Sequence, residues 1–464
     1  MPHTARKHAP IAEPSSPASD DAMRRVHEVL DRVFGAPAER TFDIRLWDGS
    51  VYGAATADVH SDFCIVFNRR GALRRMLLPP SELAIAEALV SGDVEVEGHL
   101  ESAMGLADVM GARINTLRGV AALLPRIIAL PRDEDAAPDL DPVRYSRSGG
   151  AATAGAGAAR RSAEKEIRFH YDVGNDFYAL WLDDRMLYTC AYYNEADDSL
   201  ARAQEAKLDH ICRKLRLLPG ERLLDIGCGW GGLVMHAAEH YGVQAQGITL
   251  SAAQAEWAQQ RIAQKGLSDR CRVDAVDFRD LPADARFDKM SSVGVTEHVP
   301  EDQQPAYFAR AFAALEPGGL FLNHCETSNL AARSRNTIGE RFGNWLWRRD
   351  QFIHRYVFPD ARLVALGSII TSAEKAGFET RDVESLREHY TLTLRAWLRN
   401  LEGRKEEAIA LVGERTYRVW RLYMSVSAYG FDHGAINIVQ TLLSKPTTAG
   451  RSGLPLTRDD LYAR

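Results

Sequence analysis

Hydrophobic and polar residues follow two different periods in the first part of the chain. Residues 43–50 and 63–67 have the short period of strands, whereas residues 79–90 have a helical period, with Ser81 suited to cap the helix N-terminus. No cluster of reactive side chains accompanies these segments. The pattern therefore predicts a small N-terminal α+β domain over residues 23–130.

The pattern changes at about residue 165. From there to residue 446, short apolar segments alternate with helical stretches. Five of the apolar segments predict strands: residues 222–226, 244–250, 273–278, 288–293 and 317–324. This alternation is typical of α/β proteins, so residues 165–446 are expected to form a doubly wound, mostly parallel sheet.

Other segments fit neither pattern. Residues 1–22 and 447–464 predict polar tails, and residues 131–164, which are rich in Pro, Gly and Ala, predict a flexible linker. The apolar segment 120–131 allows two interpretations. It is either a helix that packs on its own domain and is broken by Pro125, or a helix that lies on a membrane surface.

Composition sets limits on the class of protein. The chain has 464 residues, of which 45% are hydrophobic and 26% charged, as expected for a globular protein with two domains. A net charge of −6 argues against a surface built for nucleic acid. No segment approaches the ~20 apolar residues of a membrane span, and no secretory signal is evident. The six cysteines form no Cys-x-x-Cys pair, so we expect a cytoplasmic protein without a structural metal site.

A glycine-rich turn follows the segment 222–226. It contains Gly227, Gly229 and Gly231 and continues into a helical pattern at residues 233–239. A strand that passes through glycines into a helix lets the backbone turn sharply and approach a ligand closely. Both dinucleotides and S-adenosylmethionine bind at turns of this type, so the glycines alone do not identify the ligand.

Two positions distinguish a sulfonium methyl donor from NAD. Asp225, at the end of the strand, would repel a pyrophosphate but suits a cationic amino-acid group, and residues 247–251 lack the acid that an NAD site uses for its ribose. S-adenosylmethionine therefore fits better. The further candidates for cofactor contacts are Thr249, Leu250, Gln254, Asp277 and Phe278. A place in the core is an equal alternative for Phe278.

Several short segments of the C-terminal domain together resemble the cyclopropane fatty acid synthases, including the mycolic acid cyclopropane synthases. The matching segments are residues 169–176, 186–192, 204–207, 224–232, 293–298, 356–359 and 389–394, together with His324. The resemblance implies a class I methyltransferase fold with a seven-stranded sheet. It also implies that S-adenosylmethionine supplies a methylene unit to a double bond in a phospholipid acyl chain.

The resemblance also implies a site for a bicarbonate ion. In this family a cysteine, a glutamate, a histidine, a backbone carbonyl and a tyrosine hold the ion beside the donor methyl group. By motif, the four side chains correspond to Cys190, Glu297, His324 and Tyr390. Tyr188 and Thr189 are expected beside the cofactor. Each of these residue types is common in protein cores, so the joint pattern carries the assignment.

The reaction explains why a trapped anion is useful. An isolated alkene is a weak nucleophile, and its attack on a sulfonium methyl leaves a carbocation on the chain. A buried anion stabilises that charge and accepts the proton that must leave before a ring closes. His324 and Tyr390 are suited to donate hydrogen bonds to the ion, and Glu297 is suited to accept its proton.

Two positions depart from the family pattern. Glu326 stands where an apolar residue commonly lends its backbone carbonyl to the ion, and Ser427 stands where many members have cysteine. A carboxylate of Glu326 that points inward would repel bicarbonate or replace it as the base. Because loss of a proton from a chain carbon would give a methyl or methylene branch, a branch remains an alternative to the expected ring.

Aromatic residues are frequent near these motifs. Six of them are candidates either for lining an acyl channel or for packing on the sheet: Tyr171, Phe177, Tyr178, Trp181, Tyr192 and Tyr193. Residues 341–349 combine Trp with Arg, as a surface that dips into a bilayer does, but they have a structural interpretation as well.

The expected substrate is a lipid that the enzyme meets from the water side. The expected partners are unsaturated phospholipid acyl chains at the inner face of the membrane, and a second copy of the chain in a homodimer. Two other classes stay open: a lipid-binding protein that has lost activity, and a small-molecule methyltransferase that acts on nitrogen or oxygen. Retention of Cys190, Glu297, His324 and Tyr390 argues against the first, and an N- or O-methyltransferase needs no anion site.

Overall fold

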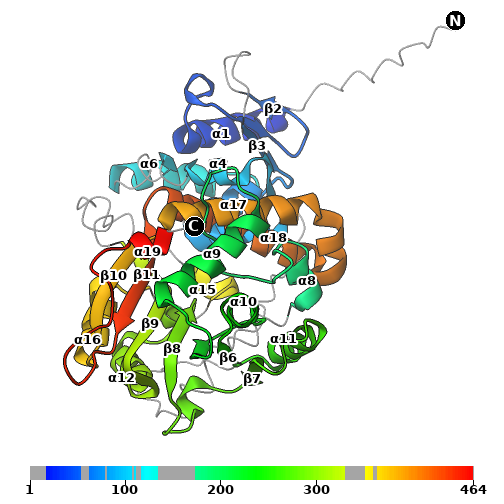
Figure 1. Cartoon of the computed structure of the whole chain (residues 1–464). Coiled ribbons are helices and arrows are strands. Elements are labelled where there is room, and N and C mark those ends of the chain that lie inside the picture. The colour runs from blue at the N-terminus through cyan, green and yellow to red at the C-terminus, as the bar shows by residue number, and fades with distance from the viewer. Residues whose placement is uncertain are drawn as a thin grey trace, which may run out of the picture. The chain divides into compact units, whose positions relative to one another are not determined.

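The structure is a computed structural model that describes two compact units. It describes residues 17–53, 62–78, 81–106, 109–110, 117–133, 173–329, 351–358 and 363–462. The described residues up to 133 belong to the first unit, and those from 173 onward belong to the second (Figure 1). Each unit has its own sheet, and each is treated by itself below.

The first unit is a four-stranded sheet with helices, in strand order β2-β1-β3-β4. Its strands are β1 (Asp43–Arg45), β2 (Val51–Tyr52), β3 (Phe63–Phe67) and β4 (Val94–Gly98). Its helices are α1 (Pro17–Phe34), the 3₁₀ turn η1 (Pro37–Glu39), α2 (Ala72–Leu77), α3 (Glu82–Ser91), α4 (Leu100–Met104) and α6 (Leu117–Ile128). As expected, Ser81 caps α3: its Oγ accepts a hydrogen bond from the amide of Ala84 at 3.1 Å.

Two expectations for this unit need correction. Helix α1 begins at Pro17, inside the segment expected to be a tail, and α6 continues through Pro125 instead of breaking there. The apolar face of α6 buries Leu123 and Ile127 and packs against α1 and α2. This packing compensates for the hydrogen bond that proline removes. The opposite face leaves Leu124 and Ile128 exposed.

The second unit contains the seven-stranded, mostly parallel sheet that the sequence indicated. Its strand order is β10-β11-β9-β8-β5-β6-β7, and β11 alone runs antiparallel to its neighbours. The strands are β5 (Arg222–Ile226), β6 (Gln244–Thr249), β7 (Cys271–Ala275), β8 (Phe287–Val293), β9 (Leu315–Ser328), β10 (Glu379–Ser385) and β11 (Ile436–Ser444). The chain reverses its direction of winding between β5 and β8, and ligands of such sheets bind beyond the carboxyl ends at that point.

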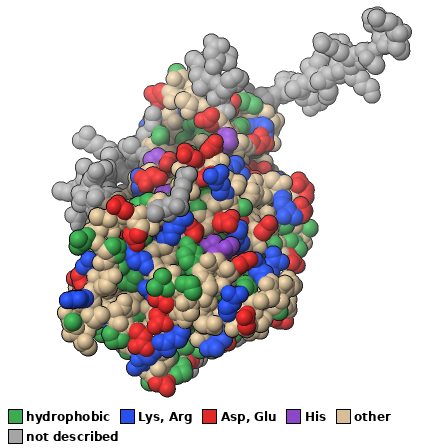
Figure 2. Space-filling view, in the orientation of Figure 1, with side chains coloured by type: hydrophobic (Ala, Val, Ile, Leu, Met, Phe, Trp, Pro, Cys, Tyr) green, Lys and Arg blue, Asp and Glu red, His purple; other side chains and the backbone are tan. Residues whose placement is uncertain are grey.

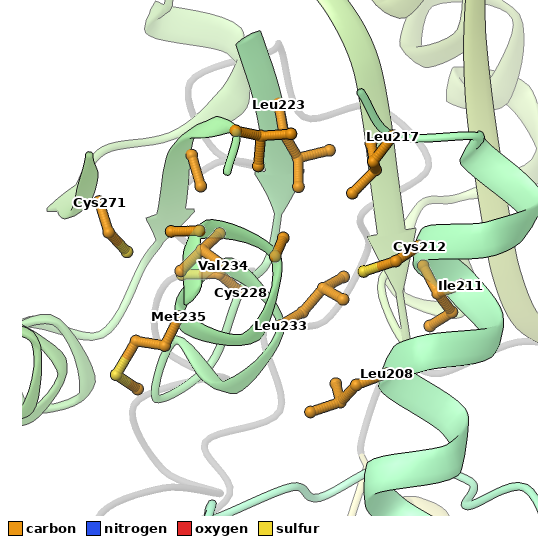
Figure 3. Close-up of a cluster of buried hydrophobic side chains, with 14 of the residues drawn as sticks. Leu208, Ile211, Cys212, Leu217, Leu223, Cys228, Leu233, Val234, Met235 and Cys271 are labelled. Carbon is orange, nitrogen blue, oxygen red and sulfur yellow. The ribbon is translucent and has the colours of Figure 1, made fainter. Parts of the chain in front are cut away.

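Helices cover both faces of this sheet (Figure 1). One layer contains α9 (Leu200–Leu215), α10 (Gly232–Tyr241) and α11 (Ala252–Gln264), and the other contains α12 (Gln304–Ala314) and α16 (Leu366–Lys375). Successive strand residues point to opposite layers: Leu223 belongs to the first core and Leu224 to the second. Figure 3 shows the first core, in which Leu208 and Ile211 of α9 point toward Leu233 of α10.

Further helices complete the second unit, and two of them contact the antiparallel strand β11. They include α8 (Asn175–Ala179), α15 (Gln351–Tyr356), α17 (Arg387–Gly403) and α18 (Lys405–Asp432), and α18 is interrupted at Gly413. Short 3₁₀ turns lie at η3 (Phe278–Asp280), η4 (Thr296–His298) and η5 (Glu301–Gln303). An aromatic cluster fills the space between α8, α17 and α18, with Trp181 in ring contact with both Trp397 and Trp420.

The C-terminal residues are not a free polar tail. Residues 459–462 form α19 (Asp459–Tyr462), whose Leu461 is buried. Arg458 pairs with Asp382 of β10 at 2.7 Å, and Asp460 pairs with Arg216 at the end of α9, also at 2.7 Å. These ion pairs explain why a polar segment packs on the second unit.

Acidic and basic side chains are interspersed on the face shown in Figure 2. Within the described ranges, no helix is both long and apolar enough to cross a membrane.

The glycine of β6 provides a test of this packing. In Gly247→Ala, the new Cβ would lie 2.6 Å from Sγ and 2.8 Å from Cβ of Cys228, which belongs to the glycine-rich turn. We expect the free energy of unfolding to fall by about 1–3 kcal/mol in urea titrations, because neither atom can move without shifting the turn. Gly367→Ala, in α16, meets nothing within 4 Å and should leave stability unchanged or slightly higher. Equal stability of Gly247→Ala and the unsubstituted protein would contradict this packing.

Candidate active site

The glycine-rich turn joins β5 to α10. Gly227, Gly229 and Gly231 all have positive φ, between 55° and 79°, a region that glycine adopts without steric cost. At Gly227, a Cβ would also lie 2.3 Å from a methyl group of Val295. The amides of Gly227 and Cys228 both donate to the carbonyl of Ile248, which fixes the turn to β6.

A cavity opens next to this turn, at the carboxyl ends of β5, β8 and β9. Its wall combines the turn with the segment 186–190, with α9 and with residues from α17 and α18. Among the sequence candidates, the following line it: Tyr188, Thr189, Cys190, Asp225, Gly227, Gly229, Gln254, Glu297, His324, Glu326 and Tyr390. All five proposed catalytic side chains therefore share one space with the glycine-rich turn.

Asp225 is buried at the cofactor side of this cavity. Its carboxylate accepts a hydrogen bond from Ser291 Oγ at 2.7 Å. Burial raises the pKa of Asp225 to about 7, while the hydroxyl of Ser291 and the positive charge of Lys207 lower it. A cationic group bound beside Asp225 would lower this pKa further, so the site suits the ammonium of an amino acid.

The remaining cofactor candidates lie outside the cavity wall. Thr249 donates to Oε1 of Gln254 at 2.8 Å and so orients a lining residue, and Leu250 is partly buried beside it. Gly231 packs against Val273 and Ala258. These three residues support the turn rather than bound the described cavity.

Asp277 and Phe278 are not brought to the described cavity either. The carboxylate of Asp277 accepts hydrogen bonds from the backbone and side chain of Arg279, including one of 2.6 Å. Phe278 is buried in the second core, where its ring lies 5.4 Å from that of Tyr307. The core alternative for Phe278 is the one that the structure adopts.

Helix α9 holds the segment that carries Tyr188, Thr189 and Cys190. Gln204 donates to the carbonyls of Leu187 and Thr189, at 3.2 and 2.9 Å. One turn later, Nζ of Lys207 donates to Thr189 Oγ1 at 2.8 Å. Sequence reasoning assigned no role to Lys207, although a lysine on the apolar face of an amphipathic helix was a usable signal.

Cys190 and His324 are both buried and neutral. Burial raises the pKa of the Cys190 thiol, whose Sγ lies 3.3 Å from the carbonyl of Ala191. Burial, with the nearby positive charges of Lys207 and Lys214, lowers the pKa of His324 to about 3. Nδ1 of His324 lies 3.3 Å from Nε2 of Gln440, and its Nε2 has no hydrogen-bond partner among the described residues.

Glu297 and Glu326 form a carboxyl pair in the same wall. The amide of Glu326 donates to Oε1 of Glu297 at 3.5 Å, and Tyr390 lines the same wall. Burial raises the pKa of both carboxyls, to about 8 for Glu297 and about 7 for Glu326, and the negative charge of Glu326 contributes to the shift at Glu297. Glu326 therefore lines the same cavity as Glu297.

The wall suits S-adenosylmethionine better than bicarbonate. The glycine-rich turn lets a ligand approach its backbone closely. Polar groups for the adenosine and amino-acid parts of the cofactor come from Asp225, Thr189 and Gln254. A bicarbonate ion would instead lie beside the two carboxyls, and either of them would repel it in its ionised form. In the part of the chain that the structure describes, no group of three or more His, Cys, Asp or Glu side chains is arranged to hold a metal ion.

Parts of the sequence motifs lie outside the described residues. They include Tyr171, residues 169–172 of one family motif and residues 341–349. Ser427 lies on α18, partly buried, and does not line the described cavity. The aromatic residues Phe177, Tyr178 and Trp181 are buried in the cluster beside α18.

The fold and the site define a class I S-adenosylmethionine-dependent methyltransferase. Residues 158–441 match the model of the mycolic acid cyclopropane synthetase family, and the chain belongs to this family. It is 39% identical to the "Probable fatty acid methyltransferase" of Pseudomonas putida over 90% of this chain and 95% of that protein. It is 37% identical to the cyclopropane-fatty-acyl-phospholipid synthase of Escherichia coli K12, over 61% of this chain and 68% of that protein.

A solved structure is also similar. The mycolic acid cyclopropane synthase CmaA1, complexed with SAH and CTAB, is 34% identical, with a TM-score of 0.56 over 60% of this chain and 97% of that chain. The shared region corresponds in extent to the second unit alone.

The carboxyl pair predicts an unusual pH dependence of stability. The pKa of Glu297 is raised in the folded state, so the folded protein keeps a proton that the unfolded chain releases. This residue therefore destabilises the fold as pH rises from about 4.3, the ordinary pKa of a glutamate, to about 8. In Glu297→Gln, the free energy of unfolding should exceed that of the unsubstituted protein by on the order of 1–3 kcal/mol at pH above 8. The difference should vanish near pH 4.

Denaturant titrations across this pH range check the prediction. Glu301→Gln, at an exposed position in η5, provides the matched control and should follow the unsubstituted protein at every pH. If Glu297→Gln is less stable at high pH, the Glu297 carboxylate is stabilised by the site and the description of the pair is wrong.

Proposed function

We propose that this enzyme adds the methyl carbon of S-adenosylmethionine to a double bond of an unsaturated fatty acyl chain and closes a cyclopropane ring. The observation that carries the proposal is the single cavity in which the glycine-rich turn meets Cys190, Glu297, His324, Glu326 and Tyr390. The similarity to a probable fatty acid methyltransferase and to a cyclopropane-fatty-acyl-phospholipid synthase supports the same chemistry.

The acyl chain would lie against the apolar part of the cavity wall. The cavity is also lined by Phe358, Leu363, Tyr423 and Ile438, which offer apolar surface and aromatic rings to a hydrocarbon. Aromatic faces also stabilise a cation in a site that excludes water. The proposed carbocation thus forms between these rings and the carboxyl pair.

We assign the base to Glu326 instead of to bicarbonate. Its carboxyl reaches the cage that the resemblance gives to the ion, and its pKa near neutrality suits a group that must accept a proton at physiological pH. Tyr390 lines the same wall, where its phenol is suited to donate to this carboxyl, and Glu297 offers a second acceptor. In this arrangement Cys190 is a weak hydrogen-bond donor and His324 is a neutral one, so neither adds charge to the site.

The proposed reaction uses these groups as follows. The alkene's π electrons form a bond to the methyl carbon, the carbon–sulfur bond breaks with its electrons on sulfur, and the adjacent chain carbon becomes cationic. Glu326 takes a proton from the new methyl group, and the electrons of that C–H bond form the third side of the ring. S-adenosylmethionine supplies the activated methyl group, and the protein positions the base.

A branched product is the second candidate, and Glu326 itself favours it. A carboxylate fixed to β9 has a restricted reach, unlike a small free ion. If the proton comes from a chain carbon, the product is a methyl-branched alkene. If a hydride first shifts between the two chain carbons, loss of a proton from the methyl gives a methylene branch.

We further propose phospholipid at a membrane surface as the source of the acyl chain. The support is the similarity to the cyclopropane-fatty-acyl-phospholipid synthase of Escherichia coli, together with the apolar side chains of the cavity wall.

The full chain, with methyl-labelled S-adenosylmethionine and vesicles of monounsaturated phospholipid, provides the test. Label should enter the acyl chain, and mass spectrometry with NMR of the released fatty acids should show a ring. In Glu326→Gln, transfer should fall by about 10²- to 10⁴-fold, because a positioned base contributes that much, while S-adenosylhomocysteine binding stays intact.

Bicarbonate distinguishes the two possible bases. The unsubstituted protein should keep its rate in buffer stripped of carbon dioxide, and Glu326→Ala, which opens space in the cage, should recover activity when bicarbonate is added. A rate that collapses without bicarbonate, together with an active Glu326→Gln, would assign the base to the ion. Label on a headgroup nitrogen instead of on carbon would overturn the proposed substrate.

A further inference from the structure

Lys207 is a buried cation in the wall of the cofactor cavity. Its side chain is 2% exposed, and it lies on the face of α9 that also carries the core residues Leu208 and Ile211. Among the described residues that line the cavity, it is the only lysine or arginine. A charged side chain in such a position is costly unless it is paired, so its environment points to a partner.

The hydrogen bonds of Lys207 are incomplete. An ammonium has three N–H donors, and Thr189 Oγ1, at 2.8 Å, is its only hydrogen-bond acceptor among the described residues. Burial lowers the pKa of Lys207 to about 8, while the negative charges of Asp183 and Asp225 oppose that shift. These groups act through charge alone, and two N–H donors are left for a ligand.

We infer that Lys207, together with Thr189, binds the carboxylate of the methionyl part of S-adenosylmethionine, while Asp225 faces its ammonium. An amino-acid group carries one charge of each sign, and the wall presents one cation and one buried carboxylate beside the glycine-rich turn. A charge-assisted hydrogen bond to a carboxylate is among the stronger contacts that a protein can make. The inference rests on S-adenosylmethionine as cofactor and is independent of the acyl substrate.

A purely structural role is less well supported. The backbone of the 186–190 segment is already held by Gln204, which donates to the carbonyls of Leu187 and Thr189. Lys207 reaches only the side chain of Thr189, and a neutral donor would do that without the cost of a buried charge. The charge itself therefore needs a ligand to explain it.

Two ligands separate the possibilities. S-adenosylhomocysteine has the amino-acid group, whereas 5′-methylthioadenosine keeps the adenosine and the sulfur but lacks that group. In Lys207→Met, calorimetry should show S-adenosylhomocysteine binding weakened by about 10- to 100-fold, with 5′-methylthioadenosine changed by less than about twofold. Lys207→Gln, which can still donate to Thr189, should show the same selective loss.

Two control variants complete the experiment. Lys289→Met removes another buried lysine, at the start of β8 and paired with Glu221 at 3.6 Å, and should change neither affinity. Gln204→Met should weaken both ligands together, because it releases the segment that bounds the whole site. Thermal unfolding of each variant checks the fold.

If Lys207→Met and Lys207→Gln lose equal affinity for both ligands, Lys207 only positions the 186–190 segment. If the affinity for S-adenosylhomocysteine is unchanged, the charge of Lys207 faces no carboxylate. Either result overturns the inference. If the unsubstituted chain binds neither S-adenosylmethionine nor S-adenosylhomocysteine, the proposed function fails first, which distinguishes that failure from this one.

Discussion

Desolvation of charged groups at one edge of the sheet is the constraint on which this enzyme's site depends. Asp225, Glu297, Glu326 and Lys207 all line one cavity, and burial moves the pKa of each toward neutrality. In water the three carboxyls would be ionised at physiological pH but only weakly basic, and the lysine would stay protonated. Burial of these four side chains lowers the stability of the fold, but it places them where the reaction needs them.

The sheet explains how these groups come together. In β9, His324 and Glu326 are two residues apart and so point to the same face, while Cys325 between them belongs to the opposite core. The antiparallel pairing with β11 sets Gln440 directly opposite His324, which brings the two side chains into contact. The single reversed strand thus supplies the support for the site's histidine.

Sequence reasoning predicted the parts that local pattern determines. The five strands and the glycine turn follow from periodicity and from positive φ at Gly227, and the shared cavity of Cys190, Glu297, His324 and Tyr390 was expected from a joint motif. It could not show that Arg279 binds the carboxylate of Asp277 or that Arg458 fixes the C-terminal segment to β10, because both depend on pairings in space. The sequence also could not show that α6 continues through Pro125, because the packing of α6 against α1 and α2 outweighs the tendency of proline to break a helix.

Charge coupling connects the two halves of the site. A cationic methyl donor beside the cavity favours the ionised forms of Asp225, Glu297 and Glu326, since an opposite charge lowers the pKa of a carboxyl. The raised pKa of Glu326 therefore falls when the donor is bound, and the base becomes available when it is needed. After transfer, the sulfur is neutral and that pKa rises again, which favours retention of the abstracted proton by the carboxyl pair. Burial thus holds the pKa of Glu326 near neutrality, and the charge of a bound donor would lower it.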